Sequence, residues 1–245
     1  MKNLTLNNLS KKYLEEKKGS SKISPSKEGK IRFDLAEGLW ESSELASLPD
    51  RSSTALKKEL SEFFSVNTTN ISIHSGADEI IEMIPRIYLN PGEKAIVLVP
   101  TFDRLISTNK KMGAEIILFE LDAERNFRLD EDGYHKLAVM IEENNPKILW
   151  ICSPNNPTGQ AIETKYIDHI ASKFPDTLIA VDEAYQEYNS LNPNDSAVSL
   201  INKYDNLLVI RSFSKAFALA GVRVGSVISN SEIISEIENF RTMYN

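Results

Sequence analysis

Short apolar runs alternate with longer amphipathic stretches along the chain after residue 30. Seven of these runs are brief and rich in Val, Ile and Leu, which predicts strands that are buried on both faces. The predicted strands are Ile71–Ile73, Ala95–Val99, Glu115–Phe119, Ile148–Cys152, Leu178–Val181, Leu207–Ile210 and Val224–Ile228. The helices predicted between them are Asp78–Leu89, Phe102–Met112, Asp132–Glu143, Lys165–Phe174 and Ala197–Lys203.

Turn-forming residues separate these elements, for example Asn90-Pro91-Gly92 and Asn145-Pro146. Strands that alternate with helices predict an α/β fold with a seven-stranded, mainly parallel sheet and helices on both faces. In such a sheet the ligand lies beyond the carboxyl ends of the strands. Functional side chains are therefore expected in the loops that follow the strands.

Composition narrows the class of protein. The 245 residues are 41% hydrophobic and 26% charged, which is ordinary for a globular chain. No apolar run approaches the roughly 18 residues that cross a bilayer, and no apolar run follows the first lysines as in a secretory signal. The single cysteine, Cys152, fits a reducing compartment. We expect a cytoplasmic protein with no membrane partner.

The net charge of −7 is unevenly distributed. Eight lysines and three glutamates give residues 1–30 a charge of +5, which leaves −12 for residues 31–245. Because phosphate neutralisation needs clustered Lys and Arg, this acidic body argues against a nucleic-acid partner. For residues 1–30 we favour a polar N-terminal extension, with a short helix near Leu9–Lys18, over an electrostatic tail. Residues 31–245 are then the folded domain.

Two loops combine small or rigid residues with polar ones. His74–Glu79 forms a small-residue turn that opens a helix, where free backbone N–H groups suit a phosphate. A plain helix cap is the simpler explanation of so short a motif. Ser153–Gly159 contains two prolines and a glycine, so it holds Asn156 in a rigid, extended loop. A structural turn remains the alternative there.

Two further strands end in ionisable residues. Asp182 closes a buried strand, where a carboxylate is costly unless it meets a positive charge such as a protonated ring nitrogen. A helix cap is the alternative. Lys215 lies between serine and the apolar run Ala216–Ala220, a setting expected to desolvate the amine and lower its pKa, as covalent chemistry with a carbonyl requires. Nearby serine hydroxyls and Arg223 suit a dianionic phosphate.

These four loops favour a single ligand that carries a phosphate, a basic ring nitrogen and a carbonyl that condenses with lysine. Pyridoxal 5′-phosphate has all three groups. No metal site is expected. A nucleotide-binding domain is the weakest alternative, since no G-x-G-x-x-G or phosphate-binding P-loop follows any predicted strand.

The motifs Asn-Asn-Pro-Thr-Gly, Asp-Glu-Ala-Tyr and Ser-Phe-Ser-Lys-Ala-Phe occur in this order within Ser153–Gly159, Asp182–Tyr185 and Ser212–Gly225. From about Arg32 to the last residue, the chain resembles the fold-type I, pyridoxal-phosphate-dependent aminotransferases of class I/II. Within that family it is most similar to histidinol-phosphate aminotransferase and threonine-phosphate decarboxylase.

The resemblance implies a role for each matched residue. Lys215 would bond the cofactor and then move a proton as the base. Asp182 would keep the ring nitrogen protonated. Asn156 and Tyr185 would donate hydrogen bonds to the phenolic oxygen of the ring, and Phe102 would stack on its face.

The resemblance also implies how the phosphate is held. The hydroxyls of Ser212 and Ser214 and the guanidinium of Arg223 would bind it, helped by the backbone N–H groups of Ala77 and Asp78. The family's substrates imply an amino acid or amino phosphate ester as donor and a 2-oxo acid as acceptor. A homodimer is implied because sites in this family lie between subunits.

Three segments depart from the family pattern. Leu48 stands where relatives carry a tyrosine that reaches the neighbouring subunit's cofactor, and Asp34–Trp40 retains only Glu37 of the usual motif. The last residues, Arg241–Asn245, resemble a segment after which relatives continue into a C-terminal small domain. We expect that domain to be absent. A decarboxylase or lyase of the same fold, and an inactive remnant that binds the cofactor, therefore remain alternatives to an aminotransferase.

Overall fold

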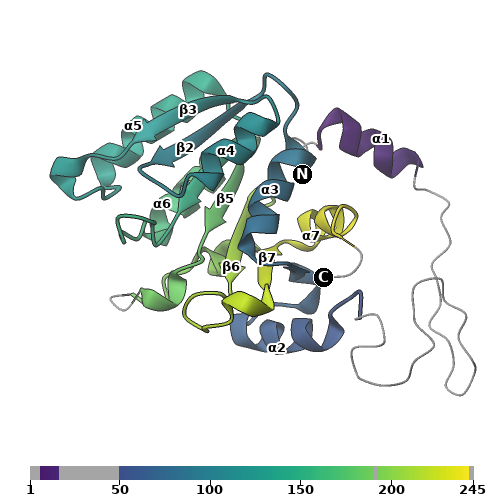
Figure 1. The fold of residues 1–245 in the computed structure, drawn as a ribbon. Coiled ribbons are helices and arrows are strands. Elements are labelled where there is room, and N and C mark those ends of the chain that lie inside the picture. The colour runs from purple at the N-terminus through teal and green to yellow at the C-terminus, as the bar shows by residue number, and fades with distance from the viewer. Residues whose placement is uncertain (1–5, 17–49, 190–191, 243–245) are drawn as a thin grey trace, which may run out of the picture.

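The computed structural model describes residues 6–16, 50–189 and 192–242. Its centre is one seven-stranded sheet in the order β1-β7-β6-β5-β4-β2-β3 (Figure 1). Strand β7 runs antiparallel to both β1 and β6, and the other neighbouring strands are parallel. The strands are Ile71–His74 (β1), Lys94–Val99 (β2), Glu115–Glu120 (β3), Ile148–Cys152 (β4), Leu178–Asp182 (β5), Leu207–Ser212 (β6) and Gly225–Ser229 (β7).

Helices cover both faces of this sheet, which confirms the predicted α/β class. The α-helices are Asn8–Glu16 (α1), Thr54–Phe64 (α2), Ala77–Tyr88 (α3), Arg104–Lys111 (α4), Glu131–Asn144 (α5), Thr164–Lys173 (α6) and Ser231–Glu238 (α7). The short 3₁₀ helices are Thr68–Asn70 (η2), Ala123–Arg125 (η3), Gln186–Tyr188 (η4), Ala197–Leu200 (η5) and Ala220–Val222 (η6). None of the helices in the described ranges is long and apolar enough to cross a membrane.

Strand β4 shows why the sheet is buried on both sides. Its five residues are all buried, and alternate side chains point to opposite faces. Trp150 joins the core formed with α3, α4 and α7, whereas Leu149 and Ile151 join the core formed with α5 and α6. The indole N–H of Trp150 donates to Asn109 Oδ1 at 3.1 Å, so the largest buried side chain has its polar atom paired.

The described part of the N-terminal extension is attached to the domain. The side chain of Asn7 donates to the carbonyl oxygens of Arg86 and Leu89, at 2.5 and 3.2 Å, at the end of α3. Those carbonyls have no partner within the helix, so Asn7 caps them. The ring of Tyr13 contacts that of Phe240 in a tilted arrangement, with ring centroids 5.4 Å apart. The helix predicted near Leu9–Lys18 is present as α1.

Three helical assignments differ from the prediction. The helix predicted over Ala197–Lys203 is only the short 3₁₀ helix η5, Ala197–Leu200. Residues 201–203 form turns and do not continue it. Helices α2 and α7 were not predicted, although each presents an apolar face to the sheet. The departures at Leu48 and Asp34–Trp40 lie outside the described residues.

Candidate active site

The carboxyl ends of β4, β5 and β6 and the first turn of α3 surround a cavity of about 550 Å³. This size is typical of a pocket for a small organic ligand. The ten residues predicted for the site all line this cavity: Ala77, Asp78, Phe102, Asn156, Asp182, Tyr185, Ser212, Ser214, Lys215 and Arg223. The structure therefore brings segments that are far apart in the sequence into one place.

Asp182 is the last residue of β5 and is buried, with 3% of its surface exposed. Its Oδ1 accepts the backbone N–H of Ala184 at 3.0 Å. Among the described residues this is the one hydrogen bond to the carboxylate, and no cation forms an ion pair with it. Burial raises the pKa of Asp182 to about 6, and the Ala184 N–H offsets part of that rise. A carboxylate in this position favours a cationic ligand.

Cys152 faces Asp182 from the neighbouring strand β4. Burial, together with the charge of Asp182, raises the pKa of the thiol to about 12. A thiol with so high a pKa is protonated at neutral pH and is a poor nucleophile. We therefore interpret Cys152 as a packing residue of the cavity lining.

A buried ion-pair network fixes the loop after β5. Arg211 Nη1 lies 3.1 Å from Glu183 Oε2, and Arg211 also contacts Glu187. Glu183 accepts further hydrogen bonds from the hydroxyl of Ser196 and the N–H of Ala197, each at 2.7 Å. Burial raises the pKa of Glu183, opposed first by Arg211. Because Glu183 directly follows Asp182, this network holds the Asp182–Tyr185 turn in place.

Lys215 lies in the connection between β6 and β7. Its Nζ is 5.7 Å from the centroid of the Tyr185 ring. The side chain is exposed, and residues 216–222 follow the surface without covering it. The expectation that the run Ala216–Ala220 desolvates the amine was wrong, because Lys215 is exposed.

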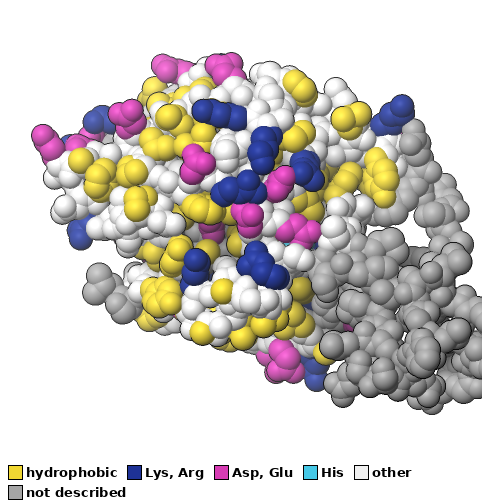
Figure 2. Space-filling model, in the orientation of Figure 1, with side chains coloured by type: hydrophobic (Ala, Val, Ile, Leu, Met, Phe, Trp, Pro, Cys, Tyr) yellow, Lys and Arg dark blue, Asp and Glu magenta, His cyan; other side chains and the backbone are white. Residues whose placement is uncertain are grey.

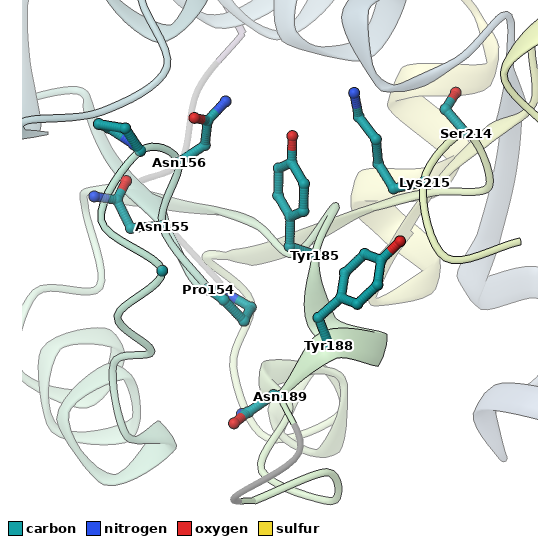
Figure 3. A pocket seen from close by; sticks show the side chains of 10 residues that line it. Pro154, Asn155, Asn156, Tyr185, Tyr188, Asn189, Ser214 and Lys215 are labelled. Carbon is teal, nitrogen blue, oxygen red and sulfur yellow. The ribbon is translucent and has the colours of Figure 1, made fainter. Parts of the chain in front are cut away.

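The loop after β4 places Asn156 on the opposite side of the cavity. Its neighbour Asn155 is buried and donates to Pro100 O at 2.8 Å and to Thr158 Oγ1 at 2.9 Å, which anchors the loop. Figure 3 shows the side chains of Asn156, Tyr185 and Lys215 pointing to the same side. These three residues also line an adjoining cavity of about 810 Å³ with Tyr188 and Asn189. Lys215 thus borders both spaces.

The first turn of α3 approaches the start of β7 very closely. A Cβ atom added at Gly225 would lie 2.6 Å from the backbone nitrogen of Ala77, so only glycine fits there. Gly76, with φ of +81°, lies beneath the guanidinium of Arg223. Arg223 donates to two carbonyl oxygens, of Ala220 and Ser75, at 3.3 and 3.4 Å. No carboxylate pairs with Arg223 among the described residues.

Arg104 also lines the cavity and was not among the predicted site residues. Its Nε and Nη2 lie 2.7 and 3.3 Å from the two carboxylate oxygens of Asp78. Nη2 also lies 3.2 Å from Glu82 Oε2. Its position, two residues after the predicted site residue Phe102, could have indicated that Arg104 lies at the site. Phe102 itself is 36% exposed and belongs to the cavity wall, not to the core.

The charges in the cavity fit pyridoxal phosphate. Within the part of the chain that the structure describes, the buried carboxylate of Asp182 has no cation and the guanidinium of Arg223, elsewhere on the wall, has no anion. A ligand with a cationic ring nitrogen and an anionic phosphate would compensate both. The free amine of Lys215 supplies the covalent partner that such a carbonyl ligand needs. No group of His, Cys, Asp and Glu within the described residues is arranged to hold a metal ion.

Residues 27–245 match the model of the family described as aminotransferase class I and II. The chain belongs to this family. Over 215 residues it is 33% identical to histidinol-phosphate aminotransferase from Ruminiclostridium cellulolyticum, an alignment that covers 88% of the chain and 58% of that relative. The chain therefore spans somewhat more than half the length of this class I and II aminotransferase.

Solved structures of class I and II aminotransferases and their relatives share the fold. Histidinol-phosphate aminotransferase from Sinorhizobium meliloti, in complex with pyridoxal-5′-phosphate, superposes with a TM-score of 0.73 at 23% identity, covering 80% of this chain and 52% of that one. L-threonine-O-3-phosphate decarboxylase from Porphyromonas gingivalis superposes with a TM-score of 0.66 at 22% identity. This alignment covers 81% of this chain and 59% of that one. At these identities the likeness concerns the fold alone.

Proposed function

We propose that the protein is a pyridoxal-phosphate-dependent aminotransferase. It would move an amino group between an amino acid or amino phosphate ester and a 2-oxo acid. The observation that carries this proposal is the shared cavity in which, among the described residues, Asp182 has no cation, Arg223 has no anion and Lys215 presents an amine. Membership of the aminotransferase family supports it independently.

When bound, pyridoxal phosphate supplies an electron-withdrawing ring that stabilises negative charge on the carbon next to the amino group. Lys215 would hold the cofactor through Nζ and, once released, carry the proton at that atom. Because Lys215 borders both cavities, its Nζ would be accessible to a cofactor in one and to a substrate in the other.

The remaining residues would bind and orient the ring. The carboxylate of Asp182 would pair with the ring nitrogen and keep it protonated. The amide of Asn156 and the hydroxyl of Tyr185 would donate hydrogen bonds to the phenolic oxygen. Phe102 would cover one face of the ring, where its exposed surface becomes buried.

The phosphate would lie against the β6–β7 connection and α3. Arg223 would pair with it, and Ser212 and Ser214 would donate their hydroxyl hydrogens. The backbone N–H groups of Ala77 and Asp78 belong to the first turn of a 12-residue helix and have no partner within that helix. They would complete the phosphate site.

Reconstitution with the cofactor tests this proposal. We expect an absorption band near the visible edge, and borohydride followed by peptide mass analysis should place the cofactor on Lys215. Lys215→Ala should abolish the band. Lys203→Ala is the matched control, because Lys203 pairs with Asp168 at 2.6 Å and does not line the cavity. A folded wild-type protein that develops no band would refute the proposal.

Product analysis identifies the reaction. Incubation with 2-oxoglutarate should yield glutamate together with the oxo product of the donor, a 2-oxo acid from an amino acid or an oxo phosphate ester from an amino phosphate ester. Release of CO₂ or of a free amine would instead establish a decarboxylase or lyase. A protein that binds the cofactor but turns over no substrate would be an inactive remnant.

We also propose a domain organisation, an oligomeric state and a cellular compartment for the protein. We assign the cofactor site to residues 31–245 and treat residues 1–30 as a polar extension whose described part, α1, packs on the domain. A homodimer is supported by the family resemblance, and light scattering after size-exclusion chromatography measures it. A cytoplasmic location is supported by the free, buried Cys152 and is tested by cell fractionation.

A further inference from the structure

The first turn of α3 carries two acidic residues, Asp78 and Glu79. Carboxylates at a helix N-terminus stabilise the helix through their interaction with its dipole. They also repel an anion that approaches the same N–H groups. Glu79 is occupied locally, since it accepts the backbone N–H of Ser75 at 2.6 Å and the hydroxyl of Thr242 at 3.0 Å. Asp78 lies on the cavity wall itself and is half exposed.

Arg104 holds the carboxylate of Asp78 in a two-point pair, through Nε at 2.7 Å and Nη2 at 3.3 Å. The planar guanidinium fork fixes the direction of the carboxylate as well as offsetting its charge. This contact raises the pKa of Arg104. Figure 2 shows acidic and basic side chains interspersed over the face that carries α3 and α4. The charge of Asp78 beside the helix terminus is therefore offset by Arg104.

Arg104 and Arg223 line the same cavity but are held differently. Arg104 is committed to Asp78 and Glu82, whereas Arg223 contacts only carbonyl oxygens among the described residues. The guanidinium of Arg223 is thus available to an anion, and that of Arg104 is not. This difference suits Arg223 to binding the phosphate and Arg104 to preparing the site for it.

We propose that Arg104 is a positioning residue, which neutralises and restrains the Asp78 carboxylate so that the first turn of α3 accepts a phosphate. The inference rests on the proposed function, because it concerns the phosphate end of the same cofactor. It adds a residue outside the family motifs on which the proposed site is built. Arg104 would act through Asp78 and would not touch the cofactor.

Cofactor binding by single and double variants tests the inference. Arg104→Gln should weaken the binding of pyridoxal phosphate about three- to tenfold, the scale of one partly exposed charge. The binding of pyridoxal, which lacks the phosphate, should stay unchanged. Asp78→Asn in the Arg104→Gln background should restore wild-type affinity for pyridoxal phosphate. High salt should shrink the difference between Arg104→Gln and wild type.

Arg86→Gln is the matched control. Arg86 pairs with Glu82 at 2.5 Å on the same helix but touches neither Asp78 nor the cavity, so its loss should leave both affinities unchanged. A double variant that binds as weakly as Arg104→Gln would mean that Arg104 acts on the ligand directly, which overturns the inference. Equal weakening for pyridoxal would also overturn it, since that result indicates a general structural role.

The two proposals fail in different ways. Wild-type protein that binds no pyridoxal phosphate would overturn the proposed function and this inference with it. Wild-type protein that binds the cofactor while Arg104→Gln binds it equally well would overturn only the role of Arg104.

Discussion

The amine of Lys215 lies over the ring of Tyr185, with Nζ 5.7 Å from the ring centroid. The two residues come from different strand connections, so the contact depends on the packing of β5 against β6. No carboxylate pairs with the amine among the described residues, which leaves it available to a ligand in either cavity.

Replacement of Lys215 should have the largest effect on turnover. Lys215→Arg keeps the positive charge but cannot bond a carbonyl carbon or carry the proton in the same way. We expect turnover to fall on the order of 10³-fold or more, since general acid–base catalysis by one group contributes about 10² to 10⁴. Steady-state kinetics of the reconstituted variant measures this. Activity within tenfold of wild type would exclude Lys215 as the base.

The buried carboxylate of Asp182 should make stability depend on pH when no cofactor is bound. Its pKa in the folded protein, about 6, lies above the ordinary value of 3.8, so the folded state binds this proton more tightly than the unfolded chain. The resulting stabilisation is complete below pH 3.8 and is lost as pH rises through 6. Asp182→Asn should therefore be more stable than wild type at pH 8, by up to about 3 kcal/mol, and similar at pH 4.

Urea denaturation of the cofactor-free proteins at both pH values checks this expectation. A wild-type protein whose stability relative to Asp182→Asn is the same at pH 4 and pH 8 would show that Asp182 ionises normally. The variant should also bind pyridoxal phosphate more weakly, because its amide cannot compensate a protonated ring nitrogen.

The Arg211–Glu183 pair should be important for stability because it is buried. Arg211→Met leaves the Glu183 carboxylate without its cation, and breaking a buried pair in this way costs about 3–5 kcal/mol. Equilibrium unfolding in urea measures the loss. Arg86→Met, which removes an exposed pair with Glu82, should cost less than about 1 kcal/mol. Equal effects of the two substitutions would contradict the burial argument.

Gly225→Ala should damage both the sheet and the phosphate site. The new Cβ would lie 2.6 Å from backbone atoms of Gly76 and Ala77, which cannot move aside as a flexible side chain can. We expect a loss of about 1–3 kcal/mol of stability, together with weaker cofactor binding. Thermal unfolding and cofactor titration measure the two effects. Gly221→Ala is the control, since nothing lies within 4 Å of its added Cβ.

The sheet was predictable because buried strands are apolar on both faces. All seven strands lie within one or two residues of their predicted ends. The amphipathic helices of the central region were predictable for a similar reason. Helix α7 was missed although Asn230, whose side chain accepts the N–H groups of Glu232 and Ile233, marks its start clearly.

Strand ends and family motifs together predicted residues that line the cavity, but not the exposure or the pairing of their side chains. Asp182 and Asn156 follow buried strands directly, so the topology fixes where they lie. The exposure of Lys215 depends on the path of residues 216–222 over the surface, which no local pattern specifies. The pairing of Arg104 with Asp78 depends likewise on how α4 packs against α3, a contact between elements and not a property of either one.

Lys215 and Arg223 lie on the same connection, and its two ends, Ser212 and Gly225, are register partners in the antiparallel β6–β7 pair. Because the two strands are paired at the base of this loop, the path or the sequence of the loop can change without displacing either strand. Exchange of residues 213–224 between members of the family would thus transplant the amine and the guanidinium together and leave the carboxylate of Asp182 with the host. Three of the ten proposed site residues, Ser214, Lys215 and Arg223, would move together, while the other seven would stay with the host.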